Sequence, residues 1–393
     1  GFLLIVNAAA AAEERSWVDA SNEHAQIVLE VLAEFNPENA ASLGVEGLDE
    51  AIIDYRPGLY ERNRSASEAV LAELRDRLAA ENHPKVRQDL EILLQAVEDG
   101  RENARLTREH LLPYYNVAAT VFGGIRGLVD PQVPRERYPA AVVRMQKYAG
   151  QIGAEKSLTE LAKDRTRERF DVDGLVGPYR GEVLQDLQRS ESMIDGIEEL
   201  LAGTDLEGWQ ETYEALARQL RDYNGWVRAE ILPRAREDYR LPRALYEDAL
   251  RNWGVDADPL DLIEQATKGY MDIRNEMEAL APLVAHEKGY ETRDYREVIA
   301  FLKRDGALDG DKLLDHYYDV LREIEAIIER EDLVTLPERE AGIRIATEAE
   351  TAIQPAAHLD IPRLLGNTGE YPSFVIPKLA QNDDGSWQQT DDT

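Results

Sequence analysis

The segment DKLLDHYYDVLREIEAIIERE, residues 311–331, shows the pattern that decides the fold class. Apolar side chains recur in it at intervals of three and four residues, the spacing that places them on one face of an α-helix. These side chains are Leu313, Tyr317, Val320, Leu321, Ile324, Ile327 and Ile328. The segment is therefore predicted to be an amphipathic helix with this face buried.

The same periodicity extends over most of the chain. It recurs in an earlier segment at Val183, Leu187, Ile194, Ile197 and Leu201. Further helices are predicted over residues 15–36, 60–80, 85–112, 134–150, 157–170, 208–236, 242–253 and 259–288. Interruptions of the periodic runs are expected at Asn36-Pro37, Gly123-Gly124, Gly203, Gly254 and Gly289. Residues 21–330 are thus predicted to form one large helical domain.

The pattern changes after Glu331. Short β-branched runs of alternating character predict strands within LVTLPERE (333–340), AGIRIATEAE (341–350) and PSFVIPKL (372–379). The segment 354–372 between the last two is rich in Pro and Gly and is expected to be a structured loop.

The predicted fold class is therefore mainly α. A large helical array is followed by a small antiparallel β region at residues 331–380, and residues 381–393 are expected to be a flexible polar tail. Two or three short strands normally pack on further structure. We therefore expect this β region to be incomplete and to pack on structure that continues beyond the sequence.

Composition excludes several classes of function. The formal net charge of −32 argues against nucleic-acid or anionic-membrane partners, because both demand a basic surface. The absence of cysteine excludes disulfides, thiolate nucleophiles and cysteine-ligated metals. No stretch approaches the ~20 apolar residues that a transmembrane helix needs. Residues 1–20 are expected to be either the remnant of a signal peptide or an apolar tail docked on the core. The first alternative predicts a periplasmic or secreted protein, and the second leaves a cytoplasmic location open.

The six histidines do not form a recognisable metal motif. No two of them are four residues apart, so no helix offers two imidazoles to one metal ion. His286-Glu287 begins like the zinc-peptidase pattern H-E-x-x-H, but Gly289 is expected to end the helix and Tyr290 stands where the second histidine should be. We interpret this stretch as a polar helix end, with His286 close to the negative end of the helix dipole.

Other catalytic signatures are absent from the sequence as well. It contains neither a phosphate-binding G-x-x-x-x-G-K-[ST] loop nor a G-x-S-x-G nucleophile elbow. The pair Tyr114-Tyr115 is expected to supply core or groove aromatics, because the acidity of the chain argues against stacking on nucleic-acid bases.

Several stretches, taken together and in order, resemble the bacterial domain-of-unknown-function family 885. They are FNPENAASLGVEGLDEAIIDYRPG (35–58), HPKVRQDLEILLQAVED (83–99), LPYYNVAATVFGGIRGLVD (112–130), WVRAEILPRAREDYRLPRALYEDAL (226–250) and IRIATEAETAIQPAAHLDIPRLLGNTGEYPSFVIP (343–377). None of them is a catalytic signature alone, and their shared order and spacing carry the resemblance.

The resemblance implies a zinc metallopeptidase of the gluzincin type, and therefore that the chain forms an incomplete metallopeptidase-like fold. In the branch that this chain resembles, a helix with the pattern H-E-x-x-x-G-H-E follows the counterpart of GNTGEYPSFVIP and supplies zinc ligands and a general base. This sequence ends at Thr393 before any such helix. We therefore assign no catalytic or metal-binding residue to it, expect zinc only in a full-length protein, and expect the chain alone to be inactive.

The resemblance also implies that Gly366 to Ile376 forms the edge of a peptide-binding cleft, where an extended substrate adds a strand to the sheet. The residues expected to line this edge are Asn367, Thr368, Gly369, Glu370 and Phe374. In the alternative interpretation, Asn367 to Gly369 is only a turn that enters the strand.

The expected partners are a peptide substrate and the C-terminal catalytic region of the same protein. Two alternatives stay open. The chain is a non-catalytic acidic helical module that binds peptides or a partner protein, or a separate chain completes the catalytic site in trans.

Overall fold

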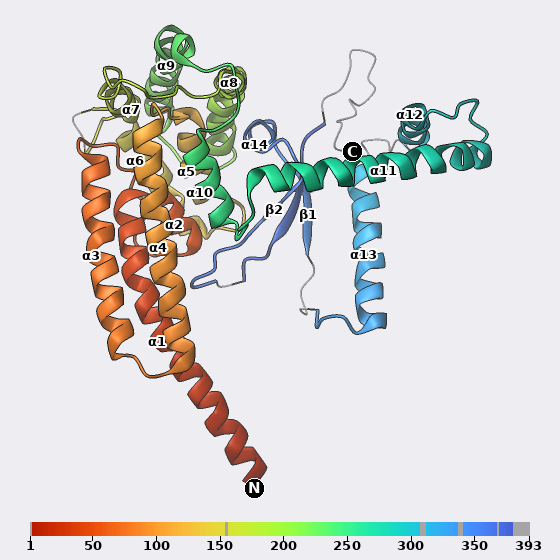
Figure 1. Cartoon of the computed structure of the whole chain (residues 1–393). Coiled ribbons are helices and arrows are strands. Elements are labelled where there is room, and N and C mark those ends of the chain that lie inside the picture. The colour runs from red at the N-terminus through yellow and green to blue at the C-terminus, as the bar shows by residue number, and fades with distance from the viewer. Residues whose placement is uncertain (1, 154–155, 307–311, 337–340, 368, 380–393) are drawn as a thin grey trace. The chain divides into compact units, whose positions relative to one another are not determined.

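The computed structural model describes residues 2–153, 156–306, 312–336, 341–367 and 369–379, and for residues 2–16 it describes the backbone only. The chain is mainly helical, with a small mixed sheet near its C-terminus, which confirms the predicted fold class (Figure 1). It divides into two compact units. Unit 1 comprises the described parts of residues 1–245 and 346–378, and unit 2 those of residues 246–345 and 379–393.

Unit 1 holds most of the helices. Their bounds are α1 Phe2–Phe35, α2 Pro37–Leu43, α3 Leu59–Ala80, α4 Pro84–His110, α5 Val117–Val129, η1 Arg135–Arg137, α6 Pro139–Tyr148, α7 Leu158–Arg167, α8 Arg180–Ala202, α9 Gln210–Trp226, the π-helical turn η2 Val227–Ile231, η3 Leu232–Arg234 and α14 Glu348–Ile353. Helix α10, Arg243–Asn252, spans the junction with unit 2. Unit 2 contains α11 Pro259–Lys288, α12 Tyr295–Asp305, α13 Leu313–Glu331 and strand β1 Gly342–Ile345.

The main core of unit 1 forms around α5, which packs against α6 and α8. Val121, Phe122 and Ile125 of α5 are at most 1% exposed. The helix runs through Gly123-Gly124, so the predicted interruption at these glycines is wrong. A Cβ atom at Gly124 would lie 2.1 Å from the hydroxyl oxygen of Tyr148. The glycine is therefore explained by close helix packing and not by a helix end.

A second, smaller core joins α1, α3 and α4. Its buried side chains are Val70, Leu71, Leu74, Val86, Leu90 and Leu94. Pro84 at the first helical position starts α4, as expected for a residue that lacks an N–H to donate and has its φ angle fixed. These three helices form a layered bundle whose apolar stripes face one another.

The three-stranded sheet has the order β1-β3-β2, where β2 is His358–Asp360 and β3 is Ser373–Ile376. Strands β2 and β3 are antiparallel, with Leu359 opposite Phe374. The strands predicted from the GIRI and SFVI runs are confirmed. The run at 333–336 is not a strand, whereas β2 lies in the segment that was predicted to be a loop. Strand β2 depends on its pairing with β3, which local sequence patterns do not report.

Helix α14 attaches the C-terminal segment of unit 1 to the helical core. Thr347 and Glu350 form a reciprocal capping box at its start. Ala349 is buried against α8, and a Cβ atom at Gly196 of α8 would lie 2.3 Å from the Cβ atom of Ala349. The missing side chain at Gly196 thus allows the two helices to make close contact.

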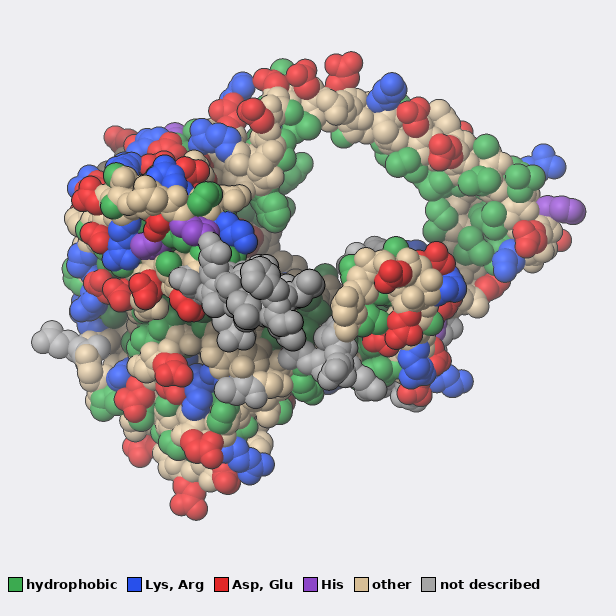
Figure 2. All heavy atoms as spheres, turned by 90° about the horizontal axis from the view of Figure 1, so that it is seen from below, with side chains coloured by type: hydrophobic (Ala, Val, Ile, Leu, Met, Phe, Trp, Pro, Cys, Tyr) green, Lys and Arg blue, Asp and Glu red, His purple; other side chains and the backbone are tan. Residues whose placement is uncertain are grey.

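Unit 2 buries little apolar surface among its described residues. Its core consists of Ala281, Ala285 and Val298, supplemented by partly buried Tyr290 and Tyr295. The predicted helix at 311–331 is confirmed as α13, but Val320 and Ile324 on its apolar face are exposed. Hydrophobic side chains lie at the surface among acidic and basic ones in Figure 2. Within the described part of the chain, no helix is both long and apolar enough to cross a membrane.

Candidate functional site

The segment that was predicted to form a cleft edge begins with a tight turn. The Asn367 side chain organises it: its Oδ1 accepts a hydrogen bond from the Gly369 amide at 2.9 Å, and its Nδ2 donates to the Glu370 carbonyl at 3.1 Å. Gly366 and Gly369 have φ angles of 59° and 127°, in the region that favours glycine. Asn367 and Gly369 therefore form a turn that leads toward β3. Thr368 lies outside the described residues.

Glu370 is held by Arg363 in a mostly buried ion pair. Its carboxylate accepts hydrogen bonds from the Arg363 Nε at 2.6 Å and from the Arg363 backbone amide at 3.3 Å. The side chains of Arg363 and Glu370 are 17% and 10% exposed. Burial disfavours the ionised carboxylate, but the hydrogen bonds from Arg363 outweigh it and lower the pKa of Glu370. This carboxylate stabilises the loop before β3, and its lowered pKa makes it a poor proton acceptor.

Phe374 is the predicted residue that lies on a strand. It is half-buried, next to Val375 and Ile376, which are at most 3% exposed. Leu359, its partner on β2, is 57% exposed. The strand expected at the cleft edge, β3, is the middle strand of the described sheet, with β1 on one side and β2 on the other, so the expectation that Gly366 to Ile376 itself forms a free edge is wrong. In the described part of the sheet, β2 has β3 on one side and no strand on the other. Strand β2 therefore forms a sheet edge, and the exposed Leu359 side chain projects from it beside Phe374.

Polar contacts fix this sheet edge to the helices of unit 1. Arg126 of α5 donates to Asp360 of β2 at 2.5 Å and pairs with Glu350 of α14 at 2.7 Å. The side-chain amide of Gln132 exchanges two hydrogen bonds with the backbone of Tyr371, at 3.0 and 3.2 Å. These contacts position the edge on a helical scaffold.

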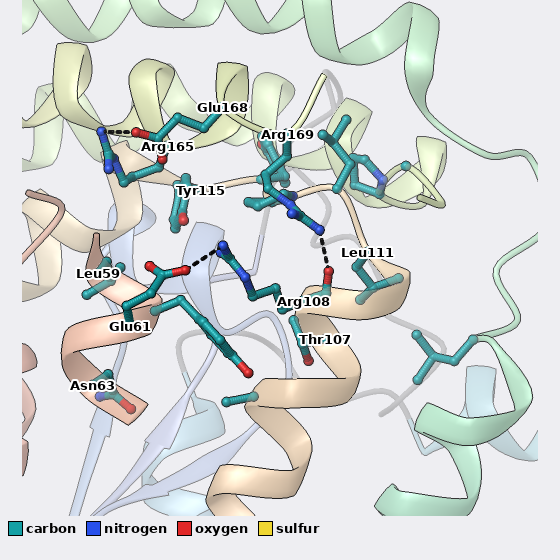
Figure 3. Close-up of a pocket in the computed structure, with 18 of the residues that line it drawn as sticks. Leu59, Glu61, Asn63, Thr107, Arg108, Leu111, Tyr115, Arg165, Glu168 and Arg169 are labelled. Atoms are coloured by element: carbon teal, nitrogen blue, oxygen red, sulfur yellow. Dashed lines mark hydrogen bonds and ion pairs between the residues drawn. The ribbon is translucent and has the colours of Figure 1, made fainter. Parts of the chain in front are cut away.

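A separate cavity of about 870 Å³ lies in unit 1 (Figure 3). It is lined by the beginning of α3, the ends of α4 and α7, the segment 111–115 and the segments around Pro178 and Arg236. Backbone hydrogen bonds join three of these parts: the amide of Leu112 donates to the Val176 carbonyl at 2.9 Å, and the amide of Arg236 donates to the Pro178 carbonyl at 2.9 Å.

Tyrosines form part of the cavity wall. Tyr114 and Tyr115, which were expected to be core or groove aromatics, both line it. The Tyr115 ring packs against Tyr55 with its centroid 4.6 Å away. The Tyr114 hydroxyl donates to Asp186 Oδ2 at 3.0 Å, and burial raises the pKa of both groups. Burial also raises the pKa of Tyr115, so both tyrosines stay neutral at physiological pH.

Four arginines and three glutamates also line the cavity: Arg108, Arg165, Arg169, Arg236, Glu61, Glu168 and Glu182. Figure 3 shows Arg108 reaching from α4 to Glu61 on α3, a pair that is 2.7 Å apart. Arg165 pairs with Glu168 at the same distance. Arg169, in the turn after α7, donates to the Arg108 backbone carbonyl at 2.6 Å, so cationic groups from α4 and from this turn converge at the end of α4.

The described residues do not assemble a zinc site. No group of three or more His, Asp or Glu side chains in this part of the chain lies close enough together to hold a metal ion. His286 is exposed in the last turn of α11, which ends at Gly289 in the left-handed conformation. This confirms the interpretation of His286-Glu287 as a helix end. His358 Nδ1 lies 3.0 Å from the Ala356 carbonyl in its own segment.

The sequence did not reveal the arginine-lined cavity. Its cationic side chains come from positions as far apart as Arg108 and Arg236, and none of them belongs to a local motif. The Tyr114-Tyr115 pair was its one visible signal. Spatial convergence of this kind depends on the helix packing and not on sequence spacing.

Comparisons with known proteins identify a family and a related fold. The family model described as "Bacterial protein of unknown function (DUF885)" matches residues 37–388. No curated protein matches the chain. Among solved structures, the crystal structure of the "putative lipoprotein from Colwellia psychrerythraea" is similar with a TM-score of 0.64 and 12% sequence identity. The alignment covers 91% of this chain and 67% of that chain. At this identity the likeness concerns the fold alone.

Proposed function

The chain belongs to the DUF885 family of bacterial proteins of unknown function, and we propose that it forms the peptide-binding part of a zinc-dependent peptidase. The observation that carries this proposal is the free edge of β2 beside β3, which is fixed to α5 by Arg126 and to the turn after α5 by Gln132. An extended peptide can add to such an edge through main-chain hydrogen bonds, and neighbouring side chains then select among peptides.

The edge has an exposed apolar residue suited to contact a peptide side chain. Leu359 projects from β2 next to Phe374 of β3, and Ile361, just beyond β2, is 65% exposed. Arg363 and Glu370 keep the following loop in one conformation by their mutual pairing. In this proposal Asn367, Gly369 and Glu370 hold the turn and loop that precede β3. The side chains of Leu359 and Phe374 contact the peptide.

The hydrolytic step is assigned to residues beyond this chain. The described residues offer no fitting set of zinc ligands. The proposed zinc helix follows residue 393 in a longer protein, in line with the resemblance of the GNTGEYPSFVIP stretch. The 393-residue chain is then expected to bind peptides without cleaving them.

We also propose that the protein is exported, to the periplasm or beyond. The similar structure from Colwellia psychrerythraea is described as a "putative lipoprotein", a description that favours an exported protein. Fractionation of cells that express the native gene tests this location: a signal confined to the cytoplasm would rule out export.

The absence of cysteine allows a clean binding test. Single cysteines are introduced as Leu359→Cys at the edge and Ile92→Cys on α4, since these side chains are 57% and 58% exposed. Each variant is labelled with an environment-sensitive fluorophore and titrated with a pool of flexible ten-residue peptides. We expect a saturable change at position 359 and none at position 92. Equal responses at both positions, or none at either, would contradict peptide binding at the edge.

Cleavage is tested separately with a protein extended past Thr393. The same peptide pool should be cut by the extended protein, with activity lost after treatment with a chelator and restored by zinc. Peptide binding at position 359 without any cleavage by the extended protein would favour the alternative function, a non-catalytic peptide-binding module.

A further inference from the structure

We propose that the arginine-lined cavity of unit 1 binds a small organic molecule through its carboxylate group. The cavity shares no residue with the β2–β3 edge, so this proposal does not depend on peptide binding there. Its volume of about 870 Å³ is within the range of sites that enclose small ligands.

The first argument concerns uncompensated positive charge. Arg108 and Arg165 each pair with a glutamate of the cavity wall. Arg169 and Arg236 instead donate to backbone carbonyls, at 2.6 Å to Arg108 and at 2.6 Å to Gly177. Among the described residues, neither Arg169 nor Arg236 has a carboxylate within ion-pair distance. An anion is the partner that two such guanidinium groups favour.

The second argument concerns buried donors without acceptors. The Nε atoms of Arg165, Arg169 and Arg236 are buried and make no hydrogen bond with any described residue. Arg165 as a whole is 6% exposed. Buried N–H groups are nearly always hydrogen-bonded in folded proteins. The three residues that carry these donors line one cavity, so their unsatisfied N–H dipoles strengthen the attraction of its wall for an anion.

The electrostatic surroundings of Arg169 agree with this interpretation. Burial lowers its pKa and the nearby positive charge of Arg108 lowers it further, while the negative charge of Glu61 opposes both without cancelling them. A bound carboxylate would relieve both effects, because it restores a negative partner to a poorly hydrated cation. The chain carries a net charge of −32, so a site for an anion requires such a local concentration of arginine.

The remaining wall favours an organic anion over an inorganic one. Tyr60, Tyr114 and Tyr115 line the cavity together with Leu59, Leu111, Pro113, Pro178 and Leu241. The Arg108 guanidinium lies over the Tyr60 ring, 4.4 Å from its centroid, which fixes both side chains. Apolar and aromatic walls with a few convergent cationic groups suit a carboxylate attached to an apolar or aromatic body.

Calorimetric titration of the whole chain with three probes tests the proposal. N-acetylphenylalanine supplies a carboxylate on an aromatic body, its primary amide removes only the charge, and inorganic phosphate supplies an anion without the body. We expect the acid to bind and the amide to bind at least about tenfold more weakly, the ratio that corresponds to one lost charge-assisted contact. Equal binding of acid and amide, or no binding of either, would overturn the proposal. Phosphate that binds as tightly as the acid would also overturn it.

Variants then locate the bound acid. Arg169→Gln and Arg236→Gln each remove a guanidinium while keeping an amide donor for the backbone carbonyl, and both are expected to weaken binding of the acid about tenfold or more. Arg75→Gln is the matched control, because Arg75 pairs with Glu98 on the exposed surface of α3 and α4. An effect of Arg75→Gln equal to that of the cavity variants would overturn the assignment. If a cavity variant does not fold, as judged by circular dichroism, the acid and amide titrations of the unaltered chain decide.

Discussion

Units 1 and 2 are built from the same kind of amphipathic helix but bury its apolar face to very different extents. In unit 1, large side chains such as Phe122 and Leu216 are at most 1% exposed. In unit 2, the buried cluster consists of Ala281, Ala285 and Val298, and Leu313 and Ile343 are buried apart from it. Burial of a large apolar side chain contributes roughly 1.5–3 kcal/mol, so unit 1 gains far more stability from its helices than unit 2.

The difference shows that an amphipathic pattern predicts a helix more reliably than it predicts burial. On α11, Leu260, Ile263 and Leu283 are at least 60% exposed, although their spacing is that of a helix in contact with a core. Isolated helices depend on tertiary packing for most of their stability. We therefore expect unit 2 to open locally at a much lower free energy than unit 1.

Amide hydrogen exchange followed by mass spectrometry tests this expectation most directly. The amides of α5 should exchange on the order of 10³-fold more slowly than those of α11, because α5 opens only with the main core whereas α11 opens locally. The second core provides an internal control, since α4 should resemble α5. Equal protection of α5 and α11 would refute the contrast between the units.

Truncation of apolar side chains should show the same contrast in equilibrium stability. Phe122→Ala removes a ring that contacts Gly196 across the main core, and it should lower the free energy of unfolding by about 3–5 kcal/mol. Leu283→Ala on α11 removes a side chain that is 66% exposed and should change it by less than about 0.5 kcal/mol. Urea denaturation monitored by circular dichroism measures both. A large cost for Leu283→Ala would reveal a partner surface on α11.

The comparison can be sharpened where two distant segments of unit 1 meet. A Cβ atom at Gly44 would lie 2.1 Å from the carbonyl oxygen of Leu365. The two segments are held together there by a hydrogen bond from the Leu365 amide to the Leu43 carbonyl. Gly44→Ala should therefore destabilise the fold by about 2–3 kcal/mol and free the loop that precedes β3.

Gly47→Ala is the matched control for this substitution. Gly47 also has a positive φ angle, 79° against 106° for Gly44, but nothing lies within 4 Å of its Cβ position. Gly47→Ala should lower the free energy of unfolding only through backbone strain at the positive φ angle, by about 1 kcal/mol. Thermal denaturation and limited proteolysis at residues 363–367 distinguish the two. Similar losses for both variants would show that the contact with Leu365 contributes little.

Most helices could be predicted from the sequence because their ends carry local signals. Pro84 starts α4, and Gly289 ends α11, each within one or two residues of its expected boundary. The interruption predicted at Gly123-Gly124 was wrong, because Gly124 is in close contact with Tyr148 of another helix. Strand β2 was not predicted, because it depends on β3, which lies more than ten residues away.

The two candidate sites also differ in how far the sequence could predict them. The resemblance implied that Asn367 to Phe374 line the edge of a peptide-binding cleft, and the structure puts the described members of this set in a turn, an ion pair and the middle strand of the sheet. Their contact with a peptide stays a prediction. The arginine cavity could not be predicted from the sequence, since Arg108, Arg169 and Arg236 come to line one cavity only through the tertiary fold.

The smallest expected effect concerns two aspartates, one in each unit, whose pKa values are both lowered. Asp54 of unit 1 is buried, with its side chain 4% exposed; burial alone would raise its pKa, but hydrogen bonds from Arg56 and Arg62 prevail. Asp305 of unit 2 is exposed, with its side chain 47% accessible, and hydrogen bonds from Tyr290 and Arg304 lower its pKa.

A lowered folded-state pKa means that the ionised form stabilises the fold. The contribution of Asp54 should be complete above its ordinary pKa of 3.8 and should disappear as the pH falls below that value, because the unfolded chain then binds the proton first. Asp54→Asn should therefore cost about 2 kcal/mol at pH 7 and progressively less toward pH 2. Asp305→Asn should change stability less at every pH, since solvent screens an exposed pair. Urea denaturation of both variants between pH 2 and 7 measures the difference, and a pH-independent cost for Asp54→Asn would show that its packing matters more than its charge.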